Sequence, residues 1–160
     1  MKEYTLTDKE IEAAIRVGTR RYNDSRKGNF KEVIYANETD RDSRIQNDIN
    51  SAGGEIAAAR ILNVPLNPPY NNFKGADLGS NIDVKTAGRD NDSLVIRPQD
   101  VDGEVDRNDW LYVHVTGSVP NYKVWGTIMV SDGKKVGRWW NPNDKGFAWF
   151  VNEKDLTQKC

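Results

Sequence analysis

Two aspartates and a lysine stand close together in the segment 75–85, which has the sequence GADLGSNIDVK. A hairpin with its loop over 79–81 would place Asp77 directly opposite Asp83, with Cβ atoms about 4.5–5.5 Å apart. Because side chains alternate between the faces of a strand, Lys85 would share the face of the two acids. The opposite face of this hairpin would be apolar and would suit a core, since it carries Ala76, Leu78, Ile82 and Val84.

Opposed carboxylates repel each other, so this pair would destabilise a purely structural hairpin. A cation between Asp77 and Asp83 would remove the repulsion, and oxygen ligands without histidine or cysteine favour Mg²⁺ or Mn²⁺. Lys85 would then orient or deprotonate a water molecule and stabilise developing negative charge. Together these groups could carry out metal-dependent hydrolysis of a phosphodiester bond.

A third acid, Glu55, is expected from a helix over about 42–62. The helix is indicated by apolar residues at helical spacing, namely Ile45, Ile49, Ala52 and Ile56. Glu55 lies at the edge of that stripe among small residues, which would let the helix approach a sheet closely. Gly53 and Gly54 cost about 1 kcal/mol each relative to alanine, so they indicate either a close backbone contact or a bend.

The order of these residues resembles the PD-(D/E)xK nuclease superfamily. The matching positions are Gly54-Glu55 on the helix, Asp77 at the hairpin, and Asp83-Val84-Lys85. The motifs lie within residues 48–85. Two departures are visible, because Ala76 stands where the family has proline and the second acid is aspartate instead of the commoner glutamate.

The resemblance implies an α/β fold with a restriction-endonuclease-like core, a mixed sheet of about four to six strands flanked by helices. It also implies that Asp77 and Asp83 bind Mg²⁺, for which Mn²⁺ can substitute, with help from Glu55 and the main-chain carbonyl of Val84. Lys85 would assist the nucleophilic water. DNA is the expected substrate, and a homodimer is a further possibility. The aromatic C-terminal part is similar to small phage-encoded members of this superfamily.

The rest of the chain predicts a single domain over residues 1–160. It would consist of an N-terminal helix and basic segment (1–40), a catalytic core (41–130) and an aromatic-rich segment (131–160). The first helix is announced by Thr7 and Glu10, a capping box, and should end within 22–29. Residues 30–35 form either a short strand or an irregular segment. Further strands are expected over 75–78, 81–86, 94–97, 110–116, 122–130 and 147–151.

Composition excludes several other kinds of site. The chain has 160 residues, a net charge of −1, one cysteine (Cys160) and one histidine (His114). An internal disulfide framework, a thiolate zinc site and a site with paired histidines are therefore excluded. No stretch is long and apolar enough for a membrane span, and the first ten residues lack the apolar core of a signal peptide. We therefore expect a cytoplasmic protein without a membrane partner.

Charge is unevenly distributed, which keeps nucleic acid open as a partner. Residues 16–31 sum to +5, from six basic residues and Asp24. Residues 77–109 sum to −5, from nine acidic and four basic residues. The basic segment is either a phosphate-contacting surface or a solvated helix face. The residues predicted to contact substrate are Arg20 and Arg21 in this segment, and Arg89 and Gln99 elsewhere in the chain.

Other interpretations of the charged hairpin remain open. A catalytically inactive nuclease-fold module would bind nucleic acid or a partner protein without cutting. A small structural or inhibitory protein would carry these charges on a solvated surface. His114 is expected to be a hydrogen-bonded, partly buried side chain. Core or interface packing is favoured over base stacking for the aromatic residues near the C-terminus, which are Trp139, Trp140, Phe147 and Trp149.

Overall fold

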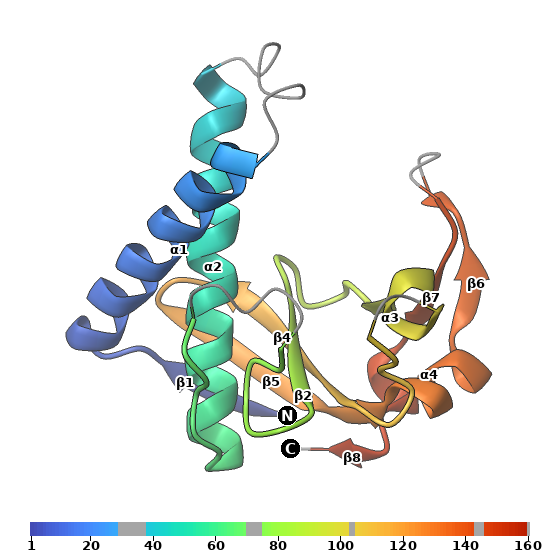
Figure 1. Ribbon diagram of the computed structural model, residues 1–160. Coiled ribbons are helices and arrows are strands. Elements are labelled where there is room, and N and C mark those ends of the chain that lie inside the picture. Colours follow the sequence, from blue (N-terminus) through green and yellow to red (C-terminus); the bar gives the residue numbers. More distant parts are fainter. Residues whose placement is uncertain (29–37, 70–74, 103–104, 143–145, 160) are drawn as a thin grey trace.

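Two long helices lie along one side of a mixed sheet, and a second, smaller sheet stands at the other side of the molecule (Figure 1). This computed structural model describes residues 1–28, 38–69, 75–102, 105–142 and 146–159. The helices are α1 (Asp8–Gly28), α2 (Glu38–Leu62), α3 (Pro98–Asp102) and α4 (Val130–Val136). The mixed sheet holds β1 (Lys2–Thr5), β2 (Ile82–Ala87), β4 (Leu111–Ser118), β5 (Asn121–Met129) and β8 (Gln158–Lys159). The smaller sheet holds β3 (Leu94–Ile96), β6 (Arg138–Trp140) and β7 (Ala148–Val151).

Helix α1 begins as the capping box predicts. The Thr7 amide donates to the Glu10 carboxylate at 3.0 Å, and the Glu10 amide donates to the Thr7 hydroxyl at 3.4 Å. The helix ends at Gly28, within the expected range 22–29. It packs closely on α2: Gly18 touches the backbone of α2, where an added Cβ would lie 2.4 Å from the Ile49 nitrogen.

Helix α2 begins a turn earlier than expected, at Glu38, and ends at Leu62 as predicted. Its two adjacent glycines mark a close approach to the sheet. A Cβ on Gly53 would lie 2.2 Å from the Tyr122 hydroxyl of β5, and a Cβ on Gly54 would lie 2.1 Å from the Thr86 hydroxyl of β2. The glycines therefore set how near α2, and with it Glu55, comes to β2.

The larger sheet has the order β1-β5-β4-β2, with β8 added beside β5. Strand β2 is parallel to β4, whereas β4 and β1 are antiparallel to β5, so the expected mixed sheet with flanking helices is confirmed. Its apolar core lies between α2 and the strands and includes Ala58, Leu78, Val113 and Val124.

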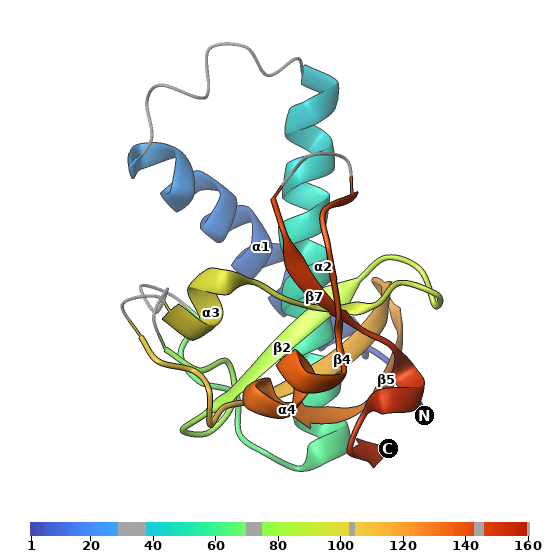
Figure 2. The same cartoon turned by 90° about the vertical axis from the view of Figure 1, so that its right-hand side faces the viewer.

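The second sheet was not anticipated as a separate unit, although two of its strands were. It has the order β3-β7-β6 and packs with α4 around a second core that includes Ile96, Ile128, Val130 and Val151. Figure 2 shows β6 and β7 rising in front of α2. Strand β6 forms the edge, and its three residues are exposed.

The predicted hairpin over 75–85 is present only in part. Leu78 and Ile82 exchange backbone hydrogen bonds at 3.0 and 3.2 Å, which is the predicted pairing. No strand forms over 75–78, because the preceding loop binds this backbone: the Asn67 amide donates to Asp77, and the Asn67 side chain donates to Ala76. The expectation of a regular strand there was wrong.

Two further expectations concern the segment 30–35 and membrane-spanning helices. The segment 30–35 falls outside the described residues. In the described part of the chain, no helix combines the length and the apolar character that crossing a membrane requires.

Candidate functional site

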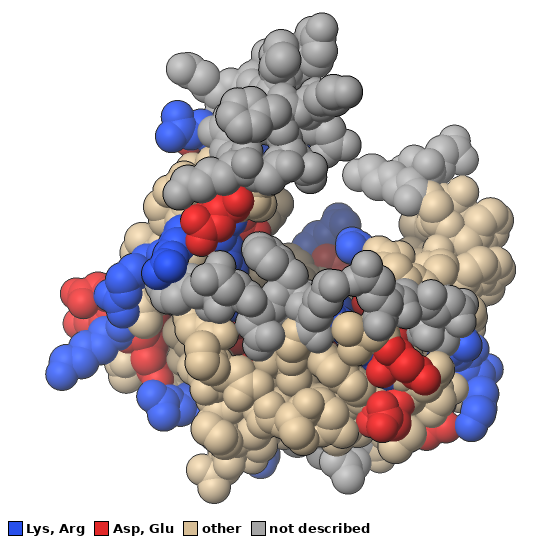
Figure 3. Space-filling model, viewed as in Figure 1, with Lys and Arg blue, Asp and Glu red and all other residues tan. Residues whose placement is uncertain are grey.

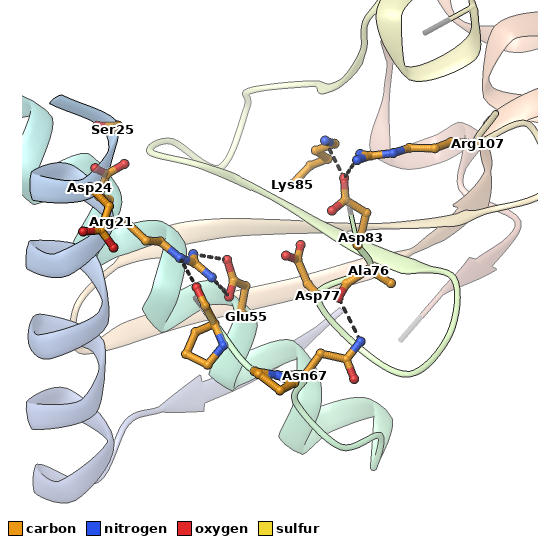
Figure 4. A pocket seen from close by; sticks show the side chains of 14 residues that line it. Arg21, Asp24, Ser25, Glu55, Asn67, Ala76, Asp77, Asp83, Lys85 and Arg107 are labelled. Carbon is orange, nitrogen blue, oxygen red and sulfur yellow. Dashed lines mark hydrogen bonds and ion pairs between the residues drawn. The ribbon is translucent and has the colours of Figure 1, made fainter. Parts of the chain in front are cut away.

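The four predicted catalytic side chains line one cavity of about 330 Å³, although they come from three separate segments (Figure 4). Glu55 is on α2, Asp77 precedes the Leu78–Ile82 bridge, and Asp83 and Lys85 project from β2. In Figure 3 acidic and basic side chains are visible at the bottom of a hollow between the long helices and the second sheet.

Asp77 carries the most perturbed carboxyl group of the site. Its Oδ2 accepts the Val84 amide proton at 2.8 Å, which places the main chain of the β2 motif against this acid. Burial, followed by the nearby charges of Glu55 and Asp83, raises the pKa of Asp77 to about 8. The three acids therefore share one electrostatic environment, as the sequence pattern predicts.

Asp83 is buried, with 7% of its surface exposed, and is surrounded by cations. Its Oδ2 lies 2.6 Å from the Lys85 Nζ and 3.4 Å from an Arg107 nitrogen. Because β2 alternates, Asp83 and Lys85 point to the same side of the strand. The Lys85 ammonium also lies 4.4 Å from the centre of the Tyr112 ring.

Arg107 is a site residue that the sequence interpretation missed. Its guanidinium lies in the cavity, 3.9 Å from Asp100 as well as near Asp83, and is held 4.6 Å from the centre of the Trp110 ring. In the sequence Arg107 only offsets an acidic stretch, so its spacing carries no signal. The position of Arg107 depends on how the chain returns to β2, 24 positions after Asp83.

Glu55 is buried and forms a two-bond ion pair with Arg21 of α1, at 2.5 and 2.8 Å. The Arg21 Nε also donates to the carbonyl of Pro69 at 3.3 Å. The structure therefore brings Arg21 into the cavity, as expected for a site residue. There it orients Glu55, a role that sequence spacing does not reveal because the partners are 34 positions apart.

The other predicted substrate contacts lie away from the acids. Arg20 forms an ion pair with Asp24 at 3.5 Å on α1 and does not line the cavity. Arg89 has 81% of its side chain exposed and pairs with Asp92 at 3.4 Å. Gln99 is exposed and lines a different hollow, beside the second sheet.

The donor set of the cavity fits a hard divalent cation such as Mg²⁺. Within the described ranges, no three residues among His, Cys, Asp and Glu are already arranged to hold a metal ion. Glu55 and Asp83 instead point to basic side chains. Burial, and after it the charges of Glu55 and Asp83, raises the pKa of Asp77, and a divalent cation would favour its ionised form.

Comparisons with known proteins do not extend this description. No protein-family model, curated protein or solved structure matches the chain. The residues that line the cavity are therefore the evidence for a function.

His114 is not part of the cavity that holds the acids. It is buried, with 1% exposed, and its Nε2 lies 3.0 Å from the Asp92 carbonyl oxygen. Burial lowers the pKa of His114. The expected hydrogen bond is present at Nε2, whereas the buried Nδ1 has no partner among the described residues.

Proposed function

We propose that this protein is a Mg²⁺-dependent nuclease with a restriction-endonuclease-like core, and that it hydrolyses phosphodiester bonds in DNA. One observation carries the proposal: Glu55, Asp77, Asp83 and Lys85 converge on a single cavity from separate parts of the chain. Two of these acids, Glu55 and Asp83, are buried beside basic partners, whereas charges on a solvated surface would remain exposed.

Asp77 and Asp83 would hold the ion, with Glu55 and the carbonyl of Val84 as further ligands. When bound, Mg²⁺ would polarise the phosphate and lower the pKa of the attacking water. The cavity of about 330 Å³ has room for a phosphate group, and its lining includes the basic side chains of Arg21, Lys85 and Arg107.

Lys85 and Arg107 would perform different tasks at that phosphate. The Lys85 Nζ, 2.6 Å from Asp83, would position the water and stabilise charge that develops on the phosphate oxygens. Arg107 has a planar guanidinium that suits phosphate, and Trp110 restricts its orientation. Arg21 would act as a positioning residue for Glu55.

The test is a cleavage assay on labelled DNA and RNA, each as single strand and duplex, with Mg²⁺, Mn²⁺ or EDTA. We expect cleavage of DNA that EDTA abolishes. Lys85→Ala and Asp83→Asn should each lower the rate by about 100-fold or more. Lys9→Ala is the matched control, because Lys9 is exposed on α1 outside the cavity. Undiminished Mg²⁺-dependent cleavage by Lys85→Ala would contradict the assignment.

A catalytically inactive binding module is the second candidate, and the ion pairs of the site favour it specifically. Arg21 already neutralises Glu55, while Lys85 and Arg107 already neutralise Asp83. Calorimetric titration with Mn²⁺ separates the two functions. The nuclease should bind Mn²⁺ and lose that binding in Asp83→Asn, whereas the module should bind nucleic acid without binding the ion.

A further inference from the structure

Strand β6 and the residue that precedes β7 present aromatic rings to solvent. Trp139 and Phe147 are 48% and 51% exposed, and their rings stack at 5.3 Å between centres with 17° between planes. Trp139 also lies against Trp149, with 4.4 Å between ring centres. The expectation of core packing was wrong for Trp139 and Phe147, because both side chains are about half exposed and β6 is the edge strand of its sheet.

The stacked pair of Trp139 and Phe147 is a platform on which further flat rings can stack. Exposed aromatic side chains forgo the free energy that burial would provide, so a solvent-facing ladder indicates a ligand that covers it. The small angle between Trp139 and Phe147 matches the parallel stacking of nucleic-acid bases.

Neighbouring hollows that share lining residues extend from this platform toward the acids. Trp139 and Phe147 line a hollow that also includes Val95 and Arg97. Those two residues line a second hollow as well, and it extends to Lys85. Lys85 in turn lines the cavity of the acids. Figure 1 shows β6 and β7 facing the long helices across the space above β2.

The charge of the two connecting hollows suits a polyanion. Their described lining contains the basic side chains of Arg97 and Lys85 and a single carboxylate, Asp100. Asp100 is buried and accepts the Arg97 amide proton at 2.9 Å. The phosphates of a nucleic acid would therefore meet positive charge along this route. An acidic protein surface could meet the same charge, but it has no bases to stack on the aromatic rings.

We propose that the β6–β7 platform, defined as Trp139 and Phe147, stacks unpaired bases of a nucleic-acid strand whose phosphates pass Arg97 toward Lys85. The substrate would then be single-stranded, or a duplex with a single-stranded segment beside the scissile bond. This inference rests on the proposed nuclease function for its direction, but binding at the platform needs neither metal nor cleavage.

Fluorescence anisotropy in EDTA tests the platform separately from catalysis. The probes are labelled oligothymidylate of about 15 nucleotides and a duplex of equal length, a size within the reach of one binding domain. The wild-type protein should bind the single strand more tightly than the duplex. Phe147→Ala should weaken single-strand binding about tenfold, because base stacking on one aromatic ring contributes at that level.

Three further variants show whether stacking is the cause. Phe147→Tyr keeps the ring and should bind like the wild type. Phe147→Leu keeps apolar area without a ring and should bind like Phe147→Ala. Trp140→Ala is the matched control, since Trp140 is 44% exposed on the same strand but does not line the hollow, and it should change affinity less than threefold.

The outcomes separate the two proposals. Single-strand binding that depends on the ring of Phe147, in a protein that fails to cleave, would support the platform and overturn the nuclease. Equal affinity of Phe147→Ala and wild type, or tighter binding of the duplex than of the single strand, would overturn the platform even if the protein cleaves DNA. Equal loss in Phe147→Ala and Trp140→Ala would also overturn it, because the effect would then not belong to the hollow.

Discussion

Replacing Asp77 by asparagine should stabilise the metal-free protein while removing its response to Mg²⁺. Asparagine has the same shape as aspartate and retains an oxygen that can accept the Val84 amide proton. It removes the charge that burial, Glu55 and Asp83 make unfavourable. The substitution therefore isolates the electrostatic cost of bringing the three acids together.

The sign and size follow from the pKa of Asp77, which rises from 3.8 to about 8 on folding. A raised folded-state pKa contributes stability that is fully present below about pH 4 and is lost as pH rises toward 8. At about 1.4 kcal/mol per pH unit, the loss by pH 7 has an upper bound of about 4 kcal/mol. Movement of Lys85 and entry of water relieve part of it, so we expect asparagine to gain about 1–2 kcal/mol at pH 7.

The assay is urea unfolding of wild type and Asp77→Asn between pH 4 and 9, in EDTA and in Mg²⁺. The stability difference in EDTA should be small near pH 4 and grow up to pH 8, with a rise in Tm of about 3–6 °C at pH 7. Mg²⁺ at ten times its Kd should stabilise the wild type by about 1.4 kcal/mol and the variant by less. Asp109→Asn is the control, because Asp109 is exposed outside the cavity.

Two results would refute this reasoning. One is a stability difference between Asp77→Asn and wild type that stays constant from pH 4 to 9, since the carboxyl would then titrate normally in the folded protein. The other is an equal effect of Asp109→Asn, which would assign the change to net charge instead of the cluster.

Three more predictions concern the packing and charges around the site. Gly54→Ala should cost about 2–3 kcal/mol in urea unfolding, because its Cβ would lie 2.1 Å from the Thr86 hydroxyl. Adding Thr86→Ala should recover part of that loss, and strictly additive losses would argue against the contact. Arg21→Ala should cost about 2–3 kcal/mol by leaving the buried Glu55 unpaired, and Glu55→Gln in the same chain should reduce the cost, as a double-mutant cycle by urea unfolding measures. Arg107→Ala should lower DNA cleavage about tenfold or more without weakening Mn²⁺ binding in calorimetry, whereas loss of Mn²⁺ binding would make Arg107 a support for Asp83 instead of a phosphate contact.

Local patterns in the sequence were enough to predict several parts of the fold and of the site. The capping box at Thr7, the core of α2 and the pairing of Leu78 with Ile82 depend on residues only a few positions apart. The grouping of Asp77 with Asp83 follows from that pairing, and the small residues around Glu55 indicated a close contact with the sheet. For these features the interacting residues and their spacing can be read directly, because helices and strands have fixed periods.

Tertiary structure alone decided which cations meet the acids and which aromatic rings remain in solvent. Arg21 reaches Glu55 only because α1 packs along α2, and Arg107 reaches Asp83 from 24 positions away. The aromatic character of Trp139 and Phe147 favours packing in a core or an interface, yet both side chains are about half exposed beside the edge strand β6. Each of these outcomes depends on how separate segments meet, which periodicity within one segment does not encode. The sequence by itself therefore determined the acids and lysine available for chemistry, and the packing of distant segments determined their partners and the surface beside them.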